Sequence, residues 1–157
     1  MDEEDVVTRL NNALRRLTDN DRYLLEFDLS ERCIASRLAL YLQNEFPEHA
    51  VDVEYNRDGA VPKRLGLPEE CANYRNPNGE ALAVPDVIVH RRGPEGPNIL
   101  VLELKKTTNR DPRDCDRARV CALREQMGYS FGALIECETR QDQAPAISIS
   151  EWFGNKS

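Results

Sequence analysis

The alternation of hydrophobic and polar positions predicts two helices ahead of the first strand. Between residues 5 and 17, hydrophobic residues recur at the spacing of an amphipathic helix. A second helix is predicted from Ser30, a residue type that caps helices, to Phe46, where Pro47 stops it. Each helix has one apolar stripe and is expected to bury it. The stripes are Val6, Val7, Leu10, Leu14 and Leu17 in the first helix, and Ile34, Ala35, Leu38, Ala39 and Leu42 in the second.

The middle of the chain predicts strands. Residues 51–55 alternate as a half-buried strand does, and the apolar runs 84–92 and 98–107 flank a Gly/Pro-rich turn, which is typical of a hairpin. Residues 57–80 between them contain several Pro, Gly and Asn, and predict a long irregular connection. Loops of that length within a domain are often functional.

The last third predicts one helix and two strands. Asp111-Pro112 has the residue types of a helix start, and the helix is expected to continue to Met127 and end at Gly128. Residues 129–137 predict a buried strand, and residues 146–153 predict a final alternating strand. The expected fold is therefore a single α/β domain over residues 1–157, with an α+β mixed sheet. Residues 1–20 form an N-terminal helical extension, residues 30–138 an αβββαβ core, and residues 146–153 an extra strand.

Size and composition fit one soluble domain. The chain has 157 residues, of which 40% are hydrophobic and 31% charged, which favours a folded globular protein over a disordered one. No apolar run approaches the length needed to cross a bilayer. The first residues, Met1-Asp2-Glu3-Glu4-Asp5, are acidic, opposite to a secretory signal. A cytoplasmic location is expected.

The five cysteines show no metal-site spacing. They are odd in number and none falls in a C-x-x-C pair, so zinc, an iron–sulfur cluster and a disulfide framework are disfavoured. We expect buried, reduced thiols. The cysteines are Cys33, Cys71, Cys115, Cys121 and Cys137.

Net charge is −7 and unevenly distributed. Residues 1–50 hold 11 acids and 6 bases, residues 51–100 hold 8 and 6, and residues 101–157 hold 9 and 9. An acidic protein is a poor nonspecific nucleic-acid binder, but local basic clusters still allow contacts with phosphates.

Two carboxylates and an ammonium lie on the predicted hairpin. Asp86 begins its first strand, and Glu103 and Lys105 end its second. Since side chains alternate along a strand, Glu103 and Lys105 share one face, and Asp86 is expected opposite roughly Leu104, next to both. Neighbouring carboxylates repel and raise one pKa unless a divalent cation or a lysine compensates. The alternative is a surface hairpin with one ordinary ion pair.

These residues carry a family resemblance. Pro85-Asp86 before an apolar strand and Glu103-Leu104-Lys105 at the end of the next resemble the signature of PD-(D/E)xK, restriction-endonuclease-like nucleases. The order helix, strand, strand, strand, helix, strand over residues 30–138 resembles the αβββαβ core of that superfamily. Ser30-Glu31-Arg32 and Glu54-Tyr55-Asn56-Arg57 are similar to a small bacterial branch of it.

The resemblance implies roles for the hairpin residues. Asp86, Glu103 and the backbone carbonyl of Leu104 would hold Mg²⁺ or Mn²⁺, for which oxygen ligands are suited. Lys105 would orient or help to deprotonate the attacking water and stabilise charge on the phosphate. Glu31, on the predicted inward face of its helix, would be an additional metal ligand or water-holder. An acid favoured by the helix dipole is its alternative.

A set of basic residues flanks the motif. They would position phosphates without reading bases, or else form a charged solvated face balanced by Asp111, Asp114 and Asp116. Arg119 is expected to form a structural ion pair, and His90 to pack or contact phosphate rather than bind metal. The candidate phosphate-binding residues are Arg57, Arg91, Arg92, Lys106, Arg110 and Arg113.

The sequence thus predicts a Mg²⁺- or Mn²⁺-dependent enzyme that hydrolyses phosphodiester bonds, in DNA first of all. One site per chain would require a homodimer for simple double-strand cutting. Two alternatives remain: a binding or assembly module that keeps the nuclease fold without cleaving, which suits the negative charge, and an RNA-acting or small-molecule phosphodiesterase.

Overall fold

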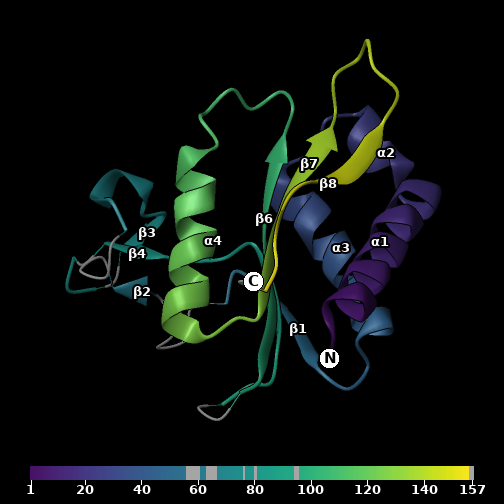
Figure 1. The fold of residues 1–157 in the computed structure, drawn as a ribbon. Coiled ribbons are helices and arrows are strands. Elements are labelled where there is room, and N and C mark those ends of the chain that lie inside the picture. Colours follow the sequence, from purple (N-terminus) through teal and green to yellow (C-terminus); the bar gives the residue numbers. More distant parts are fainter. Residues whose placement is uncertain (56–60, 63–66, 76, 80, 94–95, 156–157) are drawn as a thin grey trace.

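The protein has an α+β fold built on a five-stranded mixed sheet (Figure 1). The computed structural model describes residues 1–55, 61–62, 67–75, 77–79, 81–93 and 96–155. Helices α1 and α3 cover one face of the sheet, and helix α4 covers the other. In chain order the elements are α1 (Glu3–Asn20), α2 (Arg22–Glu26), α3 (Glu31–Glu45), β1 (Ala50–Val53), β2 (Val61–Pro62), η2 (Glu69–Cys71), β3 (Tyr74–Arg75), β4 (Ala81–Ala83), β5 (Val87–His90), β6 (Asn98–Lys106), α4 (Asp114–Met127), β7 (Phe131–Glu138) and β8 (Ala146–Phe153).

The strand order of the main sheet is β1-β5-β6-β7-β8. Three of its neighbouring pairs are antiparallel, whereas β6 and β7 are parallel. A parallel pair needs a long crossover, which α4 supplies. The central strand β6 is covered on both faces, and its run Ile99-Leu100-Val101-Leu102 is buried throughout, which explains why it is continuously apolar.

The core between α1, α3 and the sheet follows the predicted stripes. Leu10, Leu17, Leu38 and Leu42 are fully buried against sheet residues that include Leu102. The Ser30 hydroxyl accepts a hydrogen bond from the backbone N–H of Cys33 at 3.1 Å, which confirms the predicted cap of α3. Helix α1 is longer than predicted at both ends.

The first helix also contacts the last strand. The indole N–H of Trp152, on β8, donates to Glu3 Oε1 at 2.6 Å across 149 positions of sequence. Trp152 stacks on Phe131 of β7. The helical extension is therefore packed onto the sheet as part of the same unit.

The second core lies between the sheet and α4. Ile88, Val101 and Leu134 from the sheet pack with Val120 and Leu123 of the helix. The two layers approach closely at Gly132 of β7, where an added Cβ would lie 2.5 Å from Val120 Cγ1. Glycine at that position lets α4 pack directly on β7.

The prediction that residues 57–80 form an irregular connection is wrong for those of them that the structure describes. Strands β2 and β3 and the 3-10 helix η2 lie within it, and β2-β4-β3 form a small separate sheet beside α4 (Figure 1). Strands of two or three residues are too short to show an alternating pattern. Arg57 lies outside the described residues.

The predicted start of the last helix is also wrong. Helix α4 begins at Asp114, two residues after Pro112, with Arg113 as its N-cap. The chain before it is held differently: the Asn109 side chain accepts from the Asp111 N–H at 3.0 Å. At the other end Gly128 adopts a φ of 70°, which confirms the predicted stop.

Cys71 and Cys115 form a disulfide, so the expectation that all five cysteines are reduced is wrong. The bond joins η2 to the first turn of α4 across 44 positions of sequence. Cys33 and Cys137 carry free thiols, and Cys137 is buried as expected, which raises its pKa. A pairing between distant segments leaves no local spacing that a sequence motif could reveal.

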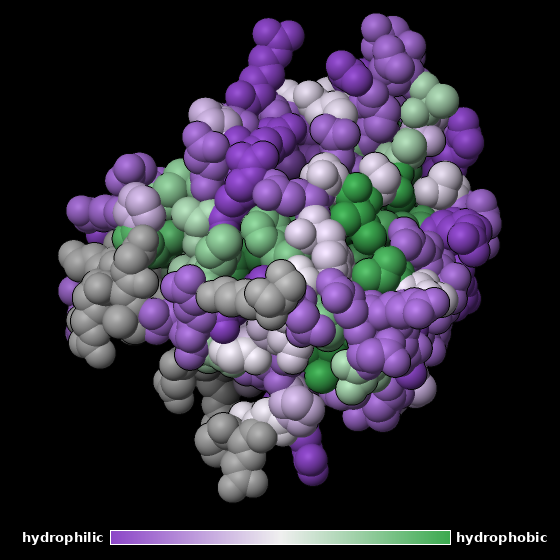
Figure 2. All heavy atoms as spheres, viewed as in Figure 1, coloured by the Kyte–Doolittle hydropathy of each residue, from purple (hydrophilic) through white to green (hydrophobic). Residues whose placement is uncertain are grey.

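Polar side chains cover most of the surface in Figure 2, with hydrophobic residues visible around α4 and between β8 and α1. This agrees with a chain in which 31% of residues are charged. Within the described part of the chain, no helix has both the length and the hydropathy to cross a membrane.

The disulfide is expected to stabilise the fold. Replacing both Cys71 and Cys115 by serine should lower the free energy of unfolding by about 2–4 kcal/mol, since the bond closes a loop of 44 positions in the unfolded chain. Urea unfolding followed by circular dichroism measures this loss. Cys33→Ser, which removes a free thiol, is the control and should unfold near the wild-type midpoint. An equal midpoint for the double variant would contradict the prediction.

Candidate active site

Asp86, Glu103 and Lys105 lie where strands β5 and β6 begin to separate. The strands pair Val87 with Leu102 and Ile88 with Val101, so one further step places Asp86 opposite Glu103. The predicted partner was Leu104, so the register is wrong by one residue. An irregularity between Val89 and His90 shifts the pairing near the turn, and counting from the turn cannot reveal it.

The predicted faces of the two strands are confirmed. Leu102 and Leu104 pack in the core with α1 and α3, whereas Val101 and Ile88 pack toward α4. Glu103 and Lys105 therefore point to the α4 side, as does Asp86.

The two carboxyl groups are neighbours in a poorly solvated place. Asp86 Oδ2 accepts from the Leu104 backbone N–H at 2.7 Å, and its carboxyl group interacts directly with that of Glu103. Burial raises the pKa of Asp86, and the charge of Glu31 adds to this. Burial, and next the charge of Asp86, raise the pKa of Glu103 well above its ordinary value. Both carboxyls are therefore costly to ionise without a compensating cation.

Helix α4 supplies two further charged residues to this place. Asp116 is 2% exposed, and its two oxygens lie 3.3 Å from Lys105 Nζ and 2.5 Å from an Arg119 guanidinium nitrogen. Arg119 Nε lies 3.5 Å from Glu103 Oε1. The expected structural ion pair of Arg119 is confirmed.

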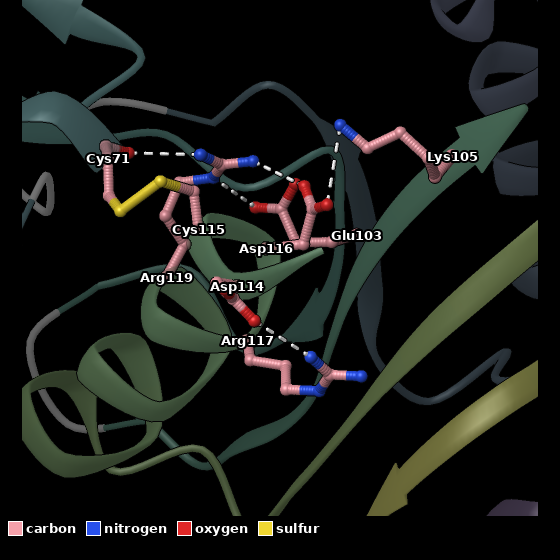
Figure 3. Close-up of a disulfide and its surroundings, with 8 residues drawn as sticks. All are labelled: Cys71, Glu103, Lys105, Asp114, Cys115, Asp116, Arg117 and Arg119. Carbon is pink, nitrogen blue, oxygen red and sulfur yellow. Dashed lines mark hydrogen bonds and ion pairs between the residues drawn. A yellow bond between two sulfur atoms is a disulfide. The ribbon is translucent and has the colours of Figure 1, made fainter. Parts of the chain in front are cut away.

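Lys105, Asp116, Arg119 and Glu103 thus form an ion network of alternating sign (Figure 3). Asp116 was not predicted as part of the site; it was expected only to balance the charge of nearby basic residues. A signal was present, because Asp116, Val120 and Leu123 follow the spacing of one helix face and all three are buried.

A pocket of about 600 Å³ adjoins the ion network. Lys105 and Arg119 lie on it, and so do both disulfide cysteines. Its acidic lining residues are Glu70, Asp111 and Asp114. The remaining lining residues are Pro68, Pro112 and Ala118.

Glu31 reaches the end of β6 from the first turn of α3. Its Oε2 accepts from the Lys106 backbone N–H at 2.8 Å, and its Oε1 from the Asn109 side chain at 3.4 Å. The side chain thus ties α3 to β6 while its charge still influences Asp86.

Three of the candidate phosphate-binding residues are engaged within the protein. Arg92 donates two hydrogen bonds to Asp52, and Lys106 pairs with Asp28 at 3.1 Å. Arg113 donates to three backbone carbonyls. Arg91 and Arg110 are exposed.

His90 is 4% exposed, and its Nε2 lies 2.6 Å from Asp52 Oδ2. The ring of Tyr55 packs edge-on against it. His90 therefore packs, as expected, at a distance from the ion network along the sheet.

Within the described ranges, no three or more His, Cys, Asp and Glu side chains gather as metal ligands do. Comparison with family models, curated proteins and solved structures found no match.

The cost of the Glu103 charge can be measured. Because the pKa of Glu103 is raised in the native protein, the native protein binds more protons than the unfolded protein does. The contribution of Glu103 to stability is therefore greatest below pH 4.5 and is lost as the pH rises through the higher native pKa. Without added metal, Glu103→Gln should flatten that fall and raise the unfolding free energy at pH 8 by about 1 kcal/mol.

Thermal unfolding in chelator between pH 5 and pH 8 measures the effect. The control is Glu136→Gln, an exposed glutamate on the neighbouring strand β7, which should keep the wild-type pH dependence. A Glu103→Gln variant that loses stability at pH 8 would contradict the prediction.

Proposed function

We propose that this protein is a Mg²⁺- or Mn²⁺-dependent nuclease of the PD-(D/E)xK type that hydrolyses phosphodiester bonds in DNA. The observation that carries the proposal is the adjacent pair of Asp86 and Glu103, both with raised pKa, with Lys105 on the same face of the sheet. Carboxyl groups with shifted pKa values occur at functional sites more often than elsewhere.

The arrangement of elements supports the same proposal. Without the small sheet, the order α3-β1-β5-β6-α4-β7 corresponds to the αβββαβ core expected from the resemblance, with Asp86 directly before β5 and Glu103 and Lys105 on β6.

The donor set fits a hard divalent cation. Glu103 Oε1 is buried and has no hydrogen-bond partner among the described residues, so one lone pair is left for a cation. Within a strand, the N–H and C=O of one residue point to the same edge. The Leu104 N–H contacts the Asp86 carboxylate, so the Leu104 carbonyl points toward the same edge of β6 as that carboxylate. Mg²⁺ in proteins commonly has one or two carboxylates and keeps several waters, so no third acidic ligand is needed.

A bound Mg²⁺ or Mn²⁺ supplies Lewis acidity and lowers the pKa of a coordinated water. Asp86 and Glu103 are the residues that would hold it, with the Leu104 carbonyl. Lys105 lies on the pocket wall, where its ammonium can orient the attacking water and stabilise negative charge on the phosphate. Glu31 fixes the end of β6, which carries Lys105, and in this proposal it would be the additional metal ligand or water-holder.

The pocket rim favours cation-dependent binding of substrate. Glu70, Asp111 and Asp114 repel a phosphate that approaches without a divalent ion. Of the basic candidates that the structure describes, Arg91 and Arg110 are exposed and are not engaged within the protein, so they are the candidates for phosphate contacts.

A non-catalytic binding module of the same fold is the second candidate. The net charge of −7 and the internal pairing of Arg92, Lys106 and Arg113 favour it. An RNA or small-molecule phosphodiesterase is the third, because a pocket of about 600 Å³ suits a small ligand.

Cleavage assays separate these candidates. Purified protein is incubated with linear, circular and branched DNA, with RNA, and with a chromogenic phosphodiester, in Mg²⁺, Mn²⁺ or chelator. We expect metal-dependent DNA cleavage that Lys105→Ala lowers by roughly 10²- to 10⁴-fold. Arg22→Ala, on the distant helix α2, is the control and should cleave as wild type does. Cleavage unaffected by Lys105→Ala, or no cleavage of any substrate, would refute the catalytic assignment.

The predicted homodimer can be tested by the products that the protein forms from circular DNA. One site per chain cuts one strand at a time, so a dimer should convert circular DNA to the linear form in one binding event. A ratio of linear to nicked product that rises with protein concentration is expected. A constant ratio together with a monomeric mass by light scattering would contradict it.

A further inference from the structure

Arg119 is the only member of the ion network that touches both acidic partners. Its guanidinium lies 2.5 Å from Asp116 Oδ1 and 3.5 Å from Glu103 Oε1, and it donates to the Cys71 carbonyl at 2.9 Å. The side chain is 11% exposed. A cation thus lies beside the carboxylate pair to which the proposed function assigns a metal.

The contacts of Arg119 differ in quality. Those with Asp116 and the Cys71 carbonyl have hydrogen-bond geometry, whereas Arg119 Nε and Glu103 Oε1 have no hydrogen-bond partner among the described residues. Arg119 is therefore fixed by Asp116 and Cys71, and it neutralises Glu103 through charge alone. A second cation can bind Glu103 without breaking either fixed contact.

The disulfide strengthens one of those contacts. Because Cys71 is bonded to Cys115 on α4, its carbonyl is held beside the helix that carries Arg119 (Figure 3). The guanidinium cannot easily withdraw when a metal arrives.

We propose that Arg119 is a built-in counter-ion of the Asp86–Glu103 pair, which compensates the two carboxylates in the metal-free protein and weakens the binding of a divalent cation there. The proposal rests on the proposed function, since it concerns the same metal site. It assigns Arg119 the role of setting the metal concentration at which the site fills.

The physical basis is a comparison of two states. Without metal, the positive charge of Arg119, 3.5 Å from Glu103 Oε1, offsets part of the cost of keeping the carboxylate pair buried. With a divalent cation bound to the pair, the same positive charge is repulsive. Even at an effective dielectric of about 20, a fixed like charge at this range weakens cation binding by roughly tenfold or more.

The test is direct Mn²⁺ binding, measured by the loss of the free-ion electron paramagnetic resonance signal, without nucleic acid. Arg119→Met should bind Mn²⁺ about tenfold more tightly than wild type. Glu103→Gln should abolish the binding in both backgrounds. Arg117→Met is the matched control, because Arg117 lies on the same helix, pairs with Asp114 and Glu151, and points away from the ion network (Figure 3). It should leave Mn²⁺ affinity unchanged.

A second comparison guards against misfolding of Arg119→Met, which leaves Asp116 without its arginine. In Asp116→Asn/Arg119→Met both buried partners are neutral, and its reference is Asp116→Asn alone. The double variant should again bind Mn²⁺ about tenfold more tightly than its reference.

The outcomes separate the two proposals. If wild type binds Mn²⁺ and removal of Arg119 leaves the affinity equal or weaker in both comparisons, Arg119 is not a competing counter-ion, while the metal site stands. If neither wild type nor any Arg119 variant binds Mn²⁺, the metal-dependent function and the counter-ion role are both refuted.

Discussion

A glutamate buried on the central strand requires the charged residues that surround it. Glu103 is 3% exposed on β6, next to Val101 and Leu102, which are fully buried. An isolated carboxylate in such surroundings is strongly disfavoured, so the neighbouring elements must supply charges of the right sign. Arg119 from α4 does so directly, and Asp116 then balances Arg119 and Lys105. The ion network exists because β6 carries a charge inside a hydrophobic layer.

Helix α4 satisfies that requirement and the topological one together. As the crossover between the parallel strands β6 and β7 it must lie on the sheet, and Gly132 lets it lie close. Close packing puts the first two turns of α4 beside β6, and Asp116 and Arg119 occupy those turns. The same element that joins the strands therefore supplies the charges for the candidate site.

The sequence predicted whatever depends on local periodicity. The helix stripes, the Ser30 cap, the hairpin, and the shared face of Glu103 and Lys105 all follow from spacing that a chain displays within ten or fifteen residues.

The features that the sequence did not predict depend on contacts between distant segments or on the exact number of residues in a strand or turn. The Cys71–Cys115 bond joins segments 44 positions apart, and the small sheet is built from strands of two or three residues. The register of Asp86 depends on one irregularity near the hairpin turn. Asp116 looked like a surface acid because basic residues surround it in the sequence, although its spacing from Val120 and Leu123 marked the buried face of α4.

The contact between α1 and β8 has a consequence for how the protein is made. Glu3 meets Trp152 only after 149 further positions have been translated, which takes roughly 7–30 s at ribosomal speeds of about 5–20 residues per second. Until then the apolar stripe of α1 can pack on α3 but lacks its neighbour from the sheet. The nascent chain therefore passes through a period in which its first helix is only partly covered.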